Sequence, residues 1–129
     1  MAKQITYEEF LYRVNEPIVD AYGHSPIQPL LTLLEGKWKM KILYALCCLE
    51  SPRFNQILTF VDGITPALLT KNLLELVDFG FVSRHQRNEK TPHVEYSLTP
   101  KGKDLLPIFY EMMNFGLSYK IKERKNLGR

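Results

Sequence analysis

Apolar side chains return at helical spacing along much of this 129-residue chain. The clearest case is the stretch ITPALLTKNLLELVDFGFV, in which Leu69, Leu73 and Leu76 fall on one face of a helix. Thr65 is a typical N-cap, a proline follows at the first helical position, and Gly80 supplies the usual stop. The pattern predicts a helix over 65–79 with one face in the core and the other exposed.

Five other segments carry helical periodicity or capping signals. They run from a Thr6–Glu9 capping box to about Asn15, from a Ser25 cap followed by Pro26 to near Gly36, from Trp38 to Leu49, from an Asn55 cap to Phe60, and from a Thr99 cap toward Lys120. The last should be one long helix that bends at Pro107, because proline removes a helical hydrogen bond.

Two strands are predicted over 81–87 and 93–98, where Val94, Tyr96 and Leu98 alternate with polar residues. The polar segment 88–92 makes them a hairpin. A short helix, a turn, a capped helix and a hairpin are the order of a helix-turn-helix followed by a wing. The expected fold is therefore mainly α with a small β-hairpin wing, in a single domain over 1–129.

The charge of the chain is uneven. The net charge is +3, but residues 1–50 carry −1 and residues 51–129 carry +4. A polyanionic partner should therefore meet the second half. The sequence has no apolar run long enough to span a membrane and its N-terminus lacks the apolar region of a signal peptide, so we expect a cytoplasmic protein without a membrane partner.

The segments LLEGKWKMKILYAL, PRFNQI, GITPALLTKNLLELVDFGFV and VEYSLTPKGKDLLPI, in this order, resemble the HxlR-type winged-helix transcription regulators of the MarR-like superfamily. The resemblance covers about residues 25–116. It implies a homodimer that binds operator DNA, with a dimerisation helix in 1–24, a DNA-binding core over 25–99 and a second dimerisation helix over 100–122. Ser25 stands where some members carry a sensing cysteine, so thiol sensing is not expected there. Asn72 and Leu74 stand where members often carry arginines.

The predicted DNA contacts lie on the 65–79 helix, on the hairpin and on two flanking segments. Lysine and asparagine can bond base edges, threonine and arginine can bond phosphates, and a helix N-terminus favours anions. The candidates are Pro66, Ala67, Thr70, Lys71 and Asn72 on the helix, Arg84, Arg87 and Lys90 on the wing, and Lys37, Arg53 and the Thr65 cap elsewhere. His85 and His93 also belong to the wing. For each set the alternative is an ordinary solvated surface.

Apolar residues near both termini are expected to form a dimer interface, because an apolar helix needs a partner to avoid an exposed patch. The candidates are Phe10, Leu11, Val14, Phe109, Met112, Met113 and Phe115. The aromatic and methionine side chains could also line a ligand cavity between subunits, so a small-molecule effector is a possible partner. Lys37, Lys39 and Lys41 are interpreted as mostly solvated, with Lys37 or Lys39 as a possible contact to the DNA backbone. Trp38 is interpreted as a core residue or a pocket wall.

The sequence offers no enzyme or cofactor motif. The three histidines and the adjacent Cys47 and Cys48 lack zinc-ligand spacing, and no phosphate-binding glycine loop or nucleophile elbow is present. We expect no catalytic residue, no metal and no cofactor, with both cysteines packed as thiols and a redox role as the alternative.

The function expected is that of a sequence-specific double-stranded DNA-binding transcriptional regulator, acting as a homodimeric repressor. The 65–79 helix would enter the major groove, and wing residues 84–93 would lie on the backbone or minor groove. The alternative is a winged-helix dimer that binds a protein or small molecule and has lost specific DNA reading.

Overall fold

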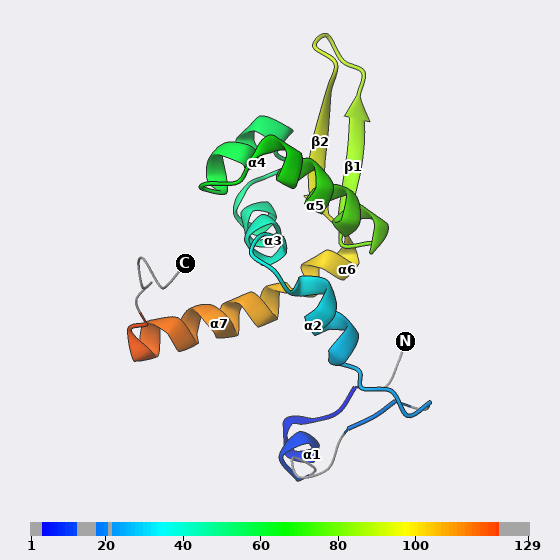
Figure 1. The fold of residues 1–129 in the computed structure, drawn as a ribbon, viewed down its shortest axis with the longest axis vertical. Coiled ribbons are helices and arrows are strands. Elements are labelled where there is room, and N and C mark those ends of the chain that lie inside the picture. The colour runs from blue at the N-terminus through cyan, green and yellow to red at the C-terminus, as the bar shows by residue number, and fades with distance from the viewer. Residues whose placement is uncertain (1–3, 13–17, 21, 122–129) are drawn as a thin grey trace. The chain divides into compact units, whose positions relative to one another are not determined.

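The computed structural model describes residues 4–12, 18–20 and 22–121. The chain divides into two compact units, 1–36 and 37–129, and each is described by itself. The described part of the first unit contains two helices, α1 (Tyr7–Tyr12) and α2 (Gln28–Leu34). The second unit contains the other five helices of the described residues and a two-stranded sheet (Figure 1).

In the first unit the predicted capping box is confirmed. The Thr6 hydroxyl accepts from the Glu9 N–H and the Glu9 carboxylate accepts from the Thr6 N–H, both at 3.0 Å. The predicted start of the second helix was wrong by two residues, because α2 begins at Gln28 rather than at Pro26. The Ser25 hydroxyl still accepts a hydrogen bond from the Gln28 N–H at 3.3 Å. Because α2 starts only at Gln28, Ser25 lies before the helix and is not its N-cap. The predicted end of α1 lies outside the described residues.

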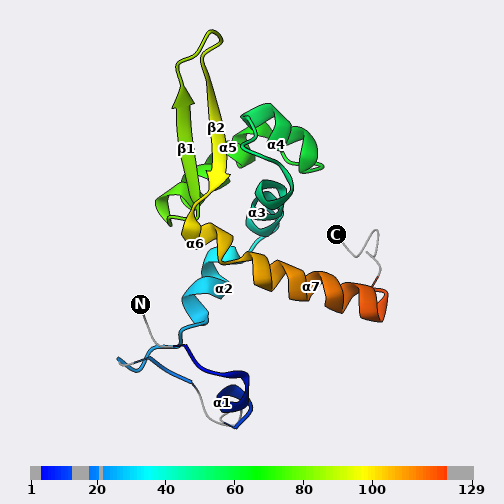
Figure 2. The ribbon, with the colours of Figure 1, turned by 180° about the vertical axis from the view of Figure 1, so that it is seen from behind.

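The second unit has the element order of a winged helix-turn-helix. It runs through α3 (Lys39–Cys48), α4 (Phe54–Phe60), α5 (Pro66–Asp78), β1 (Val82–Arg87), β2 (His93–Leu98), α6 (Pro100–Lys103) and α7 (Leu106–Tyr119). Figures 1 and 2 show the hairpin projecting beyond the helices α3, α4 and α5, and α7 leading away from them. The mainly helical fold with a hairpin wing is confirmed.

The core of this unit is centred on α3, which contacts α4, α5 and β2. Helical spacing buries Ile42, Leu43, Ala45 and Leu46 of α3 against Leu69, Leu73 and Leu76 of α5. The turn between α4 and α5 adds Val61 and Ile64 to the same core. Because these residues are buried on both sides of the turn, the two helices are held as one helix-turn-helix unit.

Both ends of α5 follow the sequence prediction. The Thr65 hydroxyl accepts from the Leu68 N–H at 3.2 Å, and Pro66 occupies the first turn. At the other end Gly80 has a φ of +83°, and the N–H groups of Gly80 and Phe81 return to the carbonyls of Val77 and Leu76 at 3.0 Å. This double return is the hydrogen-bond pattern that a left-handed glycine makes possible.

Two helix predictions in this unit were wrong. Helix α4 begins at Phe54, so its N-cap is Arg53 and not the predicted Asn55. The Gln56 side chain accepts a hydrogen bond from the Arg53 N–H at 2.8 Å. The predicted long helix after Thr99 is divided into α6 and α7, with a turn at Asp104 and Leu105. Pro107 lies in the first turn of α7, where its missing N–H breaks no helical bond.

A close contact joins α6 to the end of α5. The Thr99 hydroxyl donates to the Gly80 carbonyl, and the Lys101 ammonium donates to the Phe79 carbonyl at 2.9 Å. Gly102 is buried here, and a Cβ atom at this position would lie 2.2 Å from the Phe81 carbonyl oxygen. Only glycine therefore allows α6 to approach the segment that ends α5 and begins the wing.

Candidate nucleic-acid interface

The outer face of α5 presents a stripe of short and apolar side chains with one cation. Ala67, Thr70, Lys71 and Leu74 recur at i, i+3, i+4 and i+7 and all four are exposed, as is Pro66 at the start of the helix. The buried leucines occupy the opposite side of the helix. The structure therefore brings together most of the residues that the sequence assigned to the 65–79 helix.

Asn72 is a correction to that assignment. Its residue is only 8% exposed, and its amide donates to the Leu68 carbonyl at 2.8 Å while its oxygen accepts from the Lys39 ammonium at 3.2 Å. Both ends of the amide are therefore occupied inside the unit. A side chain held in this way cannot reach a base edge, so we remove Asn72 from the candidate contacts.

Lys39 is a second correction. The sequence left it as a solvated lysine or a possible DNA-backbone contact. Its side chain is instead only 15% exposed, and its ammonium lies 2.6 Å from a Glu75 carboxylate oxygen. The Lys39 hydrogen bond lowers the pKa of Glu75 below its ordinary value. Glu75 was not predicted to act in the site, and its pairing with Lys39 could not be predicted, because it joins positions 36 residues apart.

The flanking candidates Lys37 and Arg53 are exposed, and so is the Thr65 cap. The Lys37 and Lys41 ammonium groups lie 4.9 and 5.3 Å from the ring centroid of Trp38, within the range of cation–π attraction. Trp38 is therefore half-buried beneath two lysines rather than enclosed in the core.

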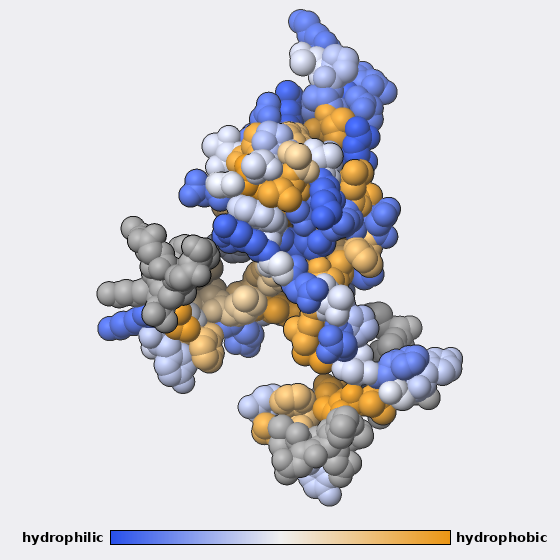
Figure 3. Space-filling model, viewed as in Figure 1, coloured by the Kyte–Doolittle hydropathy of each residue, from blue (hydrophilic) through white to orange (hydrophobic). Residues whose placement is uncertain are grey.

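The basic residues of the wing divide between its two faces. Antiparallel pairing sets Arg84 opposite Tyr96, and Arg87 opposite His93. Because side chains alternate along a strand, Arg84 shares one face with Val94, Tyr96 and Leu98, and Arg87 shares the other with His85, His93 and Glu95. Lys90 lies exposed in the connecting loop at the tip. The wing is coloured mainly as hydrophilic in Figure 3.

A carboxylate occupies the centre of one wing face. The two oxygens of Glu95 lie 3.1 Å from the Arg87 Nε atom and 2.8 Å from the His93 Nε2 atom. Arg53 pairs with Glu95 through a β-bridge, which attaches the segment before α4 to the wing. Apart from its place in the alternating strand, nothing in the sequence pointed to Glu95, because its partners depend on the hairpin register.

This arrangement shifts two pKa values in opposite directions. The pKa of His93 is raised, first by the hydrogen bond with the Thr91 carbonyl and then by the Glu95 carboxylate. The pKa of Glu95 is lowered by the hydrogen bonds from His93 and Arg87. The face of the wing that carries Arg87 is therefore an ion cluster in which two basic side chains, Arg87 and His93, bind one carboxylate.

The predicted dimerisation residues are largely exposed in the single chain. Met112 and Phe115 are 55% and 59% exposed, and Met113, Phe10 and Leu11 are exposed to similar degrees. Phe109 differs, because it is half-buried with its ring 5.9 Å from that of Tyr44. Val14 lies outside the described residues.

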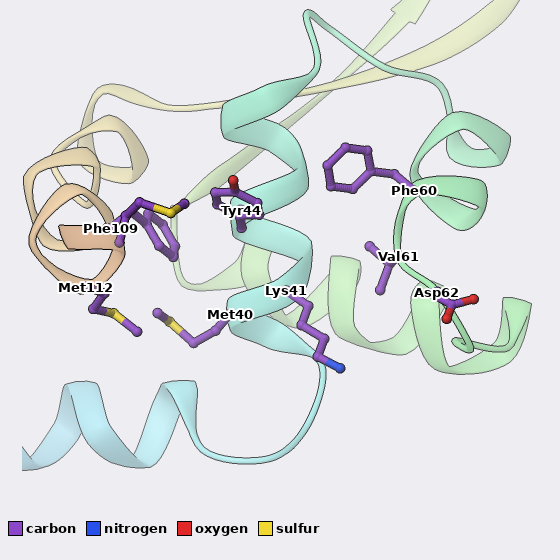
Figure 4. Close-up of a pocket in the computed structure, with 9 residues that line it drawn as sticks. Met40, Lys41, Tyr44, Phe60, Val61, Asp62, Phe109 and Met112 are labelled. Atoms are coloured by element: carbon purple, nitrogen blue, oxygen red, sulfur yellow. The ribbon is translucent and has the colours of Figure 1, made fainter. Parts of the chain in front are cut away.

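A cavity of about 540 Å³ lies between α3, the end of α4 and α7 (Figure 4). Its walls are mostly methionine and aromatic side chains, with two charged residues among them. The lining residues are Met40, Lys41, Tyr44, Phe60, Val61, Asp62, Phe109, Met112 and Met113. The sequence suggested a ligand cavity between two subunits, whereas this cavity lies within one chain and includes residues of α3 and α4.

The cysteines differ in their surroundings. Cys47 is half-buried, and burial raises the pKa of its thiol, whereas Cys48 is exposed, so the prediction that both are packed was wrong for Cys48. Within the described part of the chain, no three histidine, cysteine or acidic side chains gather as metal ligands. No helix of that part is long and apolar enough to cross a membrane.

A model of the HxlR-like helix-turn-helix family matches residues 33–124, which include the helix-turn-helix, the wing and α7. The chain belongs to this family. Among HxlR-like relatives, it is 35% identical over 94 residues to the HTH-type transcriptional regulator YdzF of Bacillus subtilis, covering 73% of this chain and 86% of YdzF. It is 39% identical over 93 residues to the regulator BH0655 of Halalkalibacterium halodurans, covering 72% and 82% of the two chains.

Solved structures agree with this HxlR-like assignment. The reduced form of the redox regulator HypR has a TM-score of 0.67 and 36% identity, covering 74% of this chain and 94% of that one. A MarR-family regulator from Porphyromonas gingivalis W83 has a TM-score of 0.66 and 29% identity, covering 85% and 98%. The chain is thus an HxlR-like transcriptional regulator with a winged helix-turn-helix fold, and not an enzyme.

Proposed function

We propose that this HxlR-like regulator binds a specific double-stranded DNA operator, with α5 in the major groove. The observation that carries the proposal is the exposed stripe of α5, which lies between a turn and a basic hairpin in the order of a winged helix-turn-helix. Lys71 can donate to a guanine edge, and Thr70 can bond a phosphate or touch a thymine methyl group. Ala67 and Leu74 can add only apolar contacts.

The wing is proposed to supply most of the phosphate contacts. Arg84 and Arg87 lie on opposite faces, so a wing lying flat on the backbone uses one of them. A wing whose tip enters the minor groove places both arginines beside a phosphate strand, with Lys90 leading. Arg87 must exchange part of its bond with Glu95 for a phosphate, whereas none of the described carboxylates is paired with Arg84.

The acting form is proposed to be a homodimer in which α7 and α1 supply the interface. Support comes from the apolar side chains of α7, which are exposed to an extent unusual for a stable monomer. Two copies would set their α5 helices on half-sites about one helical turn of DNA apart, near 34 Å, or a multiple of that. Repression remains the expected outcome of operator binding by such a dimer.

A second candidate function is a ligand-binding dimer without specific DNA reading. The cavity favours it, since its volume and apolar walls suit a small organic molecule. In the operator-binding proposal the same cavity suits an effector, because it contacts both the α4–α5 turn through Val61 and Asp62 and the proposed dimerisation helix through Met112.

Polarisation titrations with the duplex upstream of the protein's own gene and with a scrambled duplex separate these functions. Lys71→Ala should raise the operator Kd about tenfold, which corresponds to the loss of one good base contact. Arg87→Ala should weaken binding to both duplexes equally, and it should lower the slope of log affinity against log salt concentration by about one, as expected for one lost phosphate contact. Lys103→Ala, an exposed lysine of α6, is the matched control. Equal weak binding of the two duplexes by the wild-type protein would favour the second function.

A further inference from the structure

The ammonium group of Lys39 lies between two polar side chains of α5. It is 2.6 Å from the Glu75 Oε1 atom and 3.2 Å from the Asn72 Oδ1 atom. The Asn72 amide is itself fixed by its bond to the Leu68 carbonyl. Lys39 is thus held from α3 against one edge of the proposed reading helix.

Glu75 also neighbours the cation on which that helix depends. It follows Lys71 by four residues, which places the two side chains one turn apart on the same side of α5. The positive charge of Lys71 acts on Glu75 in the structure, contributing after Lys39 to its lowered pKa. Two lysines therefore compete for one carboxylate, and the hydrogen bond at 2.6 Å belongs to Lys39.

The consequence concerns the availability of Lys71. If Glu75 lost Lys39, its carboxylate would be released beside Lys71, where an i, i+4 ion pair can form. Lys71 would then be turned toward its own helix, and a negative charge would face the DNA backbone. Among the residues on the outer stripe of α5, Lys71 is the only cation, so its capture would remove the charged contact of the helix.

We propose that Lys39 is a positioning residue for DNA recognition, which binds Glu75 and so reserves Lys71 for the operator. This inference rests on the proposed operator-binding function. It gives a role to Lys39, Asn72 and Glu75 together: Asn72 fixes the ammonium, the ammonium neutralises the carboxylate, and the reading lysine remains exposed.

The test is a double-mutant cycle between positions 39 and 71, measured as operator Kd at a temperature where circular dichroism shows every variant folded. Lys39→Met should raise the operator Kd on the order of tenfold, as loss of the Lys71 contact does. In the Lys39→Met background, Lys71→Ala should raise the operator Kd by less than about threefold, because the contact between Lys71 and the operator is already lost. Lys103→Met is the control for removing a lysine elsewhere and should leave the Kd unchanged.

The Lys39→Met, Glu75→Gln variant supplies the second arm. Without a carboxylate to capture Lys71, operator affinity should return to within about threefold of wild type. If Lys39 instead contacts a phosphate directly, the operator affinity of this variant stays low, and the slope of log affinity against log salt concentration falls by about one. That result, or additive effects of the 39 and 71 substitutions, would overturn the inference.

The two proposals fail in different ways. A wild-type protein that binds operator and scrambled duplexes equally refutes operator reading, and the role of Lys39 with it. A wild-type protein that prefers the operator, together with a Lys39→Met variant that retains the full preference, refutes only the role of Lys39.

Discussion

His93 lies where a neutral imidazole cannot satisfy both of its hydrogen-bond partners. Its Nδ1 atom is 2.8 Å from the Thr91 carbonyl oxygen and its Nε2 atom is 2.8 Å from a Glu95 oxygen. Both partners are acceptors, and only the protonated ring carries two N–H donors. The geometry therefore agrees with the raised pKa of His93 and explains it.

This pairing predicts a pH-dependent stability. A histidine whose pKa is raised on folding stabilises the fold fully below its unfolded pKa, near 6.5, and loses that contribution as the pH rises through the folded value. His93→Gln should therefore lower the free energy of unfolding at about pH 5.5 to 6.5 and have a diminishing effect toward about pH 9. Urea unfolding across that range measures it, with His24→Gln as the control. A difference that grows with pH would contradict the assignment.

Individual residues also show where sequence reasoning ends. The outer stripe of α5 could be predicted because helical periodicity separates exposed residues from the buried leucines. Asn72 and Lys39 could not, since both lie at the edge of the buried face, where periodicity does not decide exposure. Their burial depends on contacts between α3 and α5, which cannot be predicted from the local sequence pattern of either helix.

At the scale of elements, the start and end signals of helices were the most reliable predictions. Threonine caps at Thr6, Thr65 and Thr99 and the glycine stop at Gly80 are all present, because a cap bonds only within its own turn. One start signal failed at Asn55, which lies inside α4 rather than before it, and the other failures were at prolines. Pro26 precedes its helix, and Pro107 begins a new one, because the same residue suits a first turn and breaks an interior.

The junction between α5 and α6 gives a prediction at this scale. Gly102→Ala should destabilise the fold by about 3 kcal/mol, the upper part of the range for overpacking, because its Cβ would meet the Phe81 carbonyl oxygen. Urea unfolding measures the effect. Gly116→Ala in α7 is the control, since a Cβ there has no neighbour within 4 Å and alanine favours a helix. Equal stability of the two variants would show that α6 does not need this close approach.

At the scale of the whole molecule, the proposed dimer determines whether the reading helices act together. A Met113→Glu, Phe115→Glu variant should be monomeric, because two carboxylates would have to be buried in an apolar interface. Sedimentation or light scattering measures the mass, and the operator Kd should rise with it. The control Asn114→Glu adds one carboxylate on the polar stripe that Asn114 shares with Glu111 and Ser118, and it should remain dimeric. A dimeric double variant would place the interface elsewhere.

The single cation on the outer stripe of α5 affects how strongly non-specific genomic DNA competes with the operator for this regulator. Affinity for unrelated DNA comes almost entirely from cations on phosphates, and a genome offers about a million or more such competing sites. A helix that recognises its target mainly by shape and apolar contact adds little to this background. Such a regulator would spend less of its time on the wrong sequences, and a small number of copies in the cell would suffice to occupy one promoter.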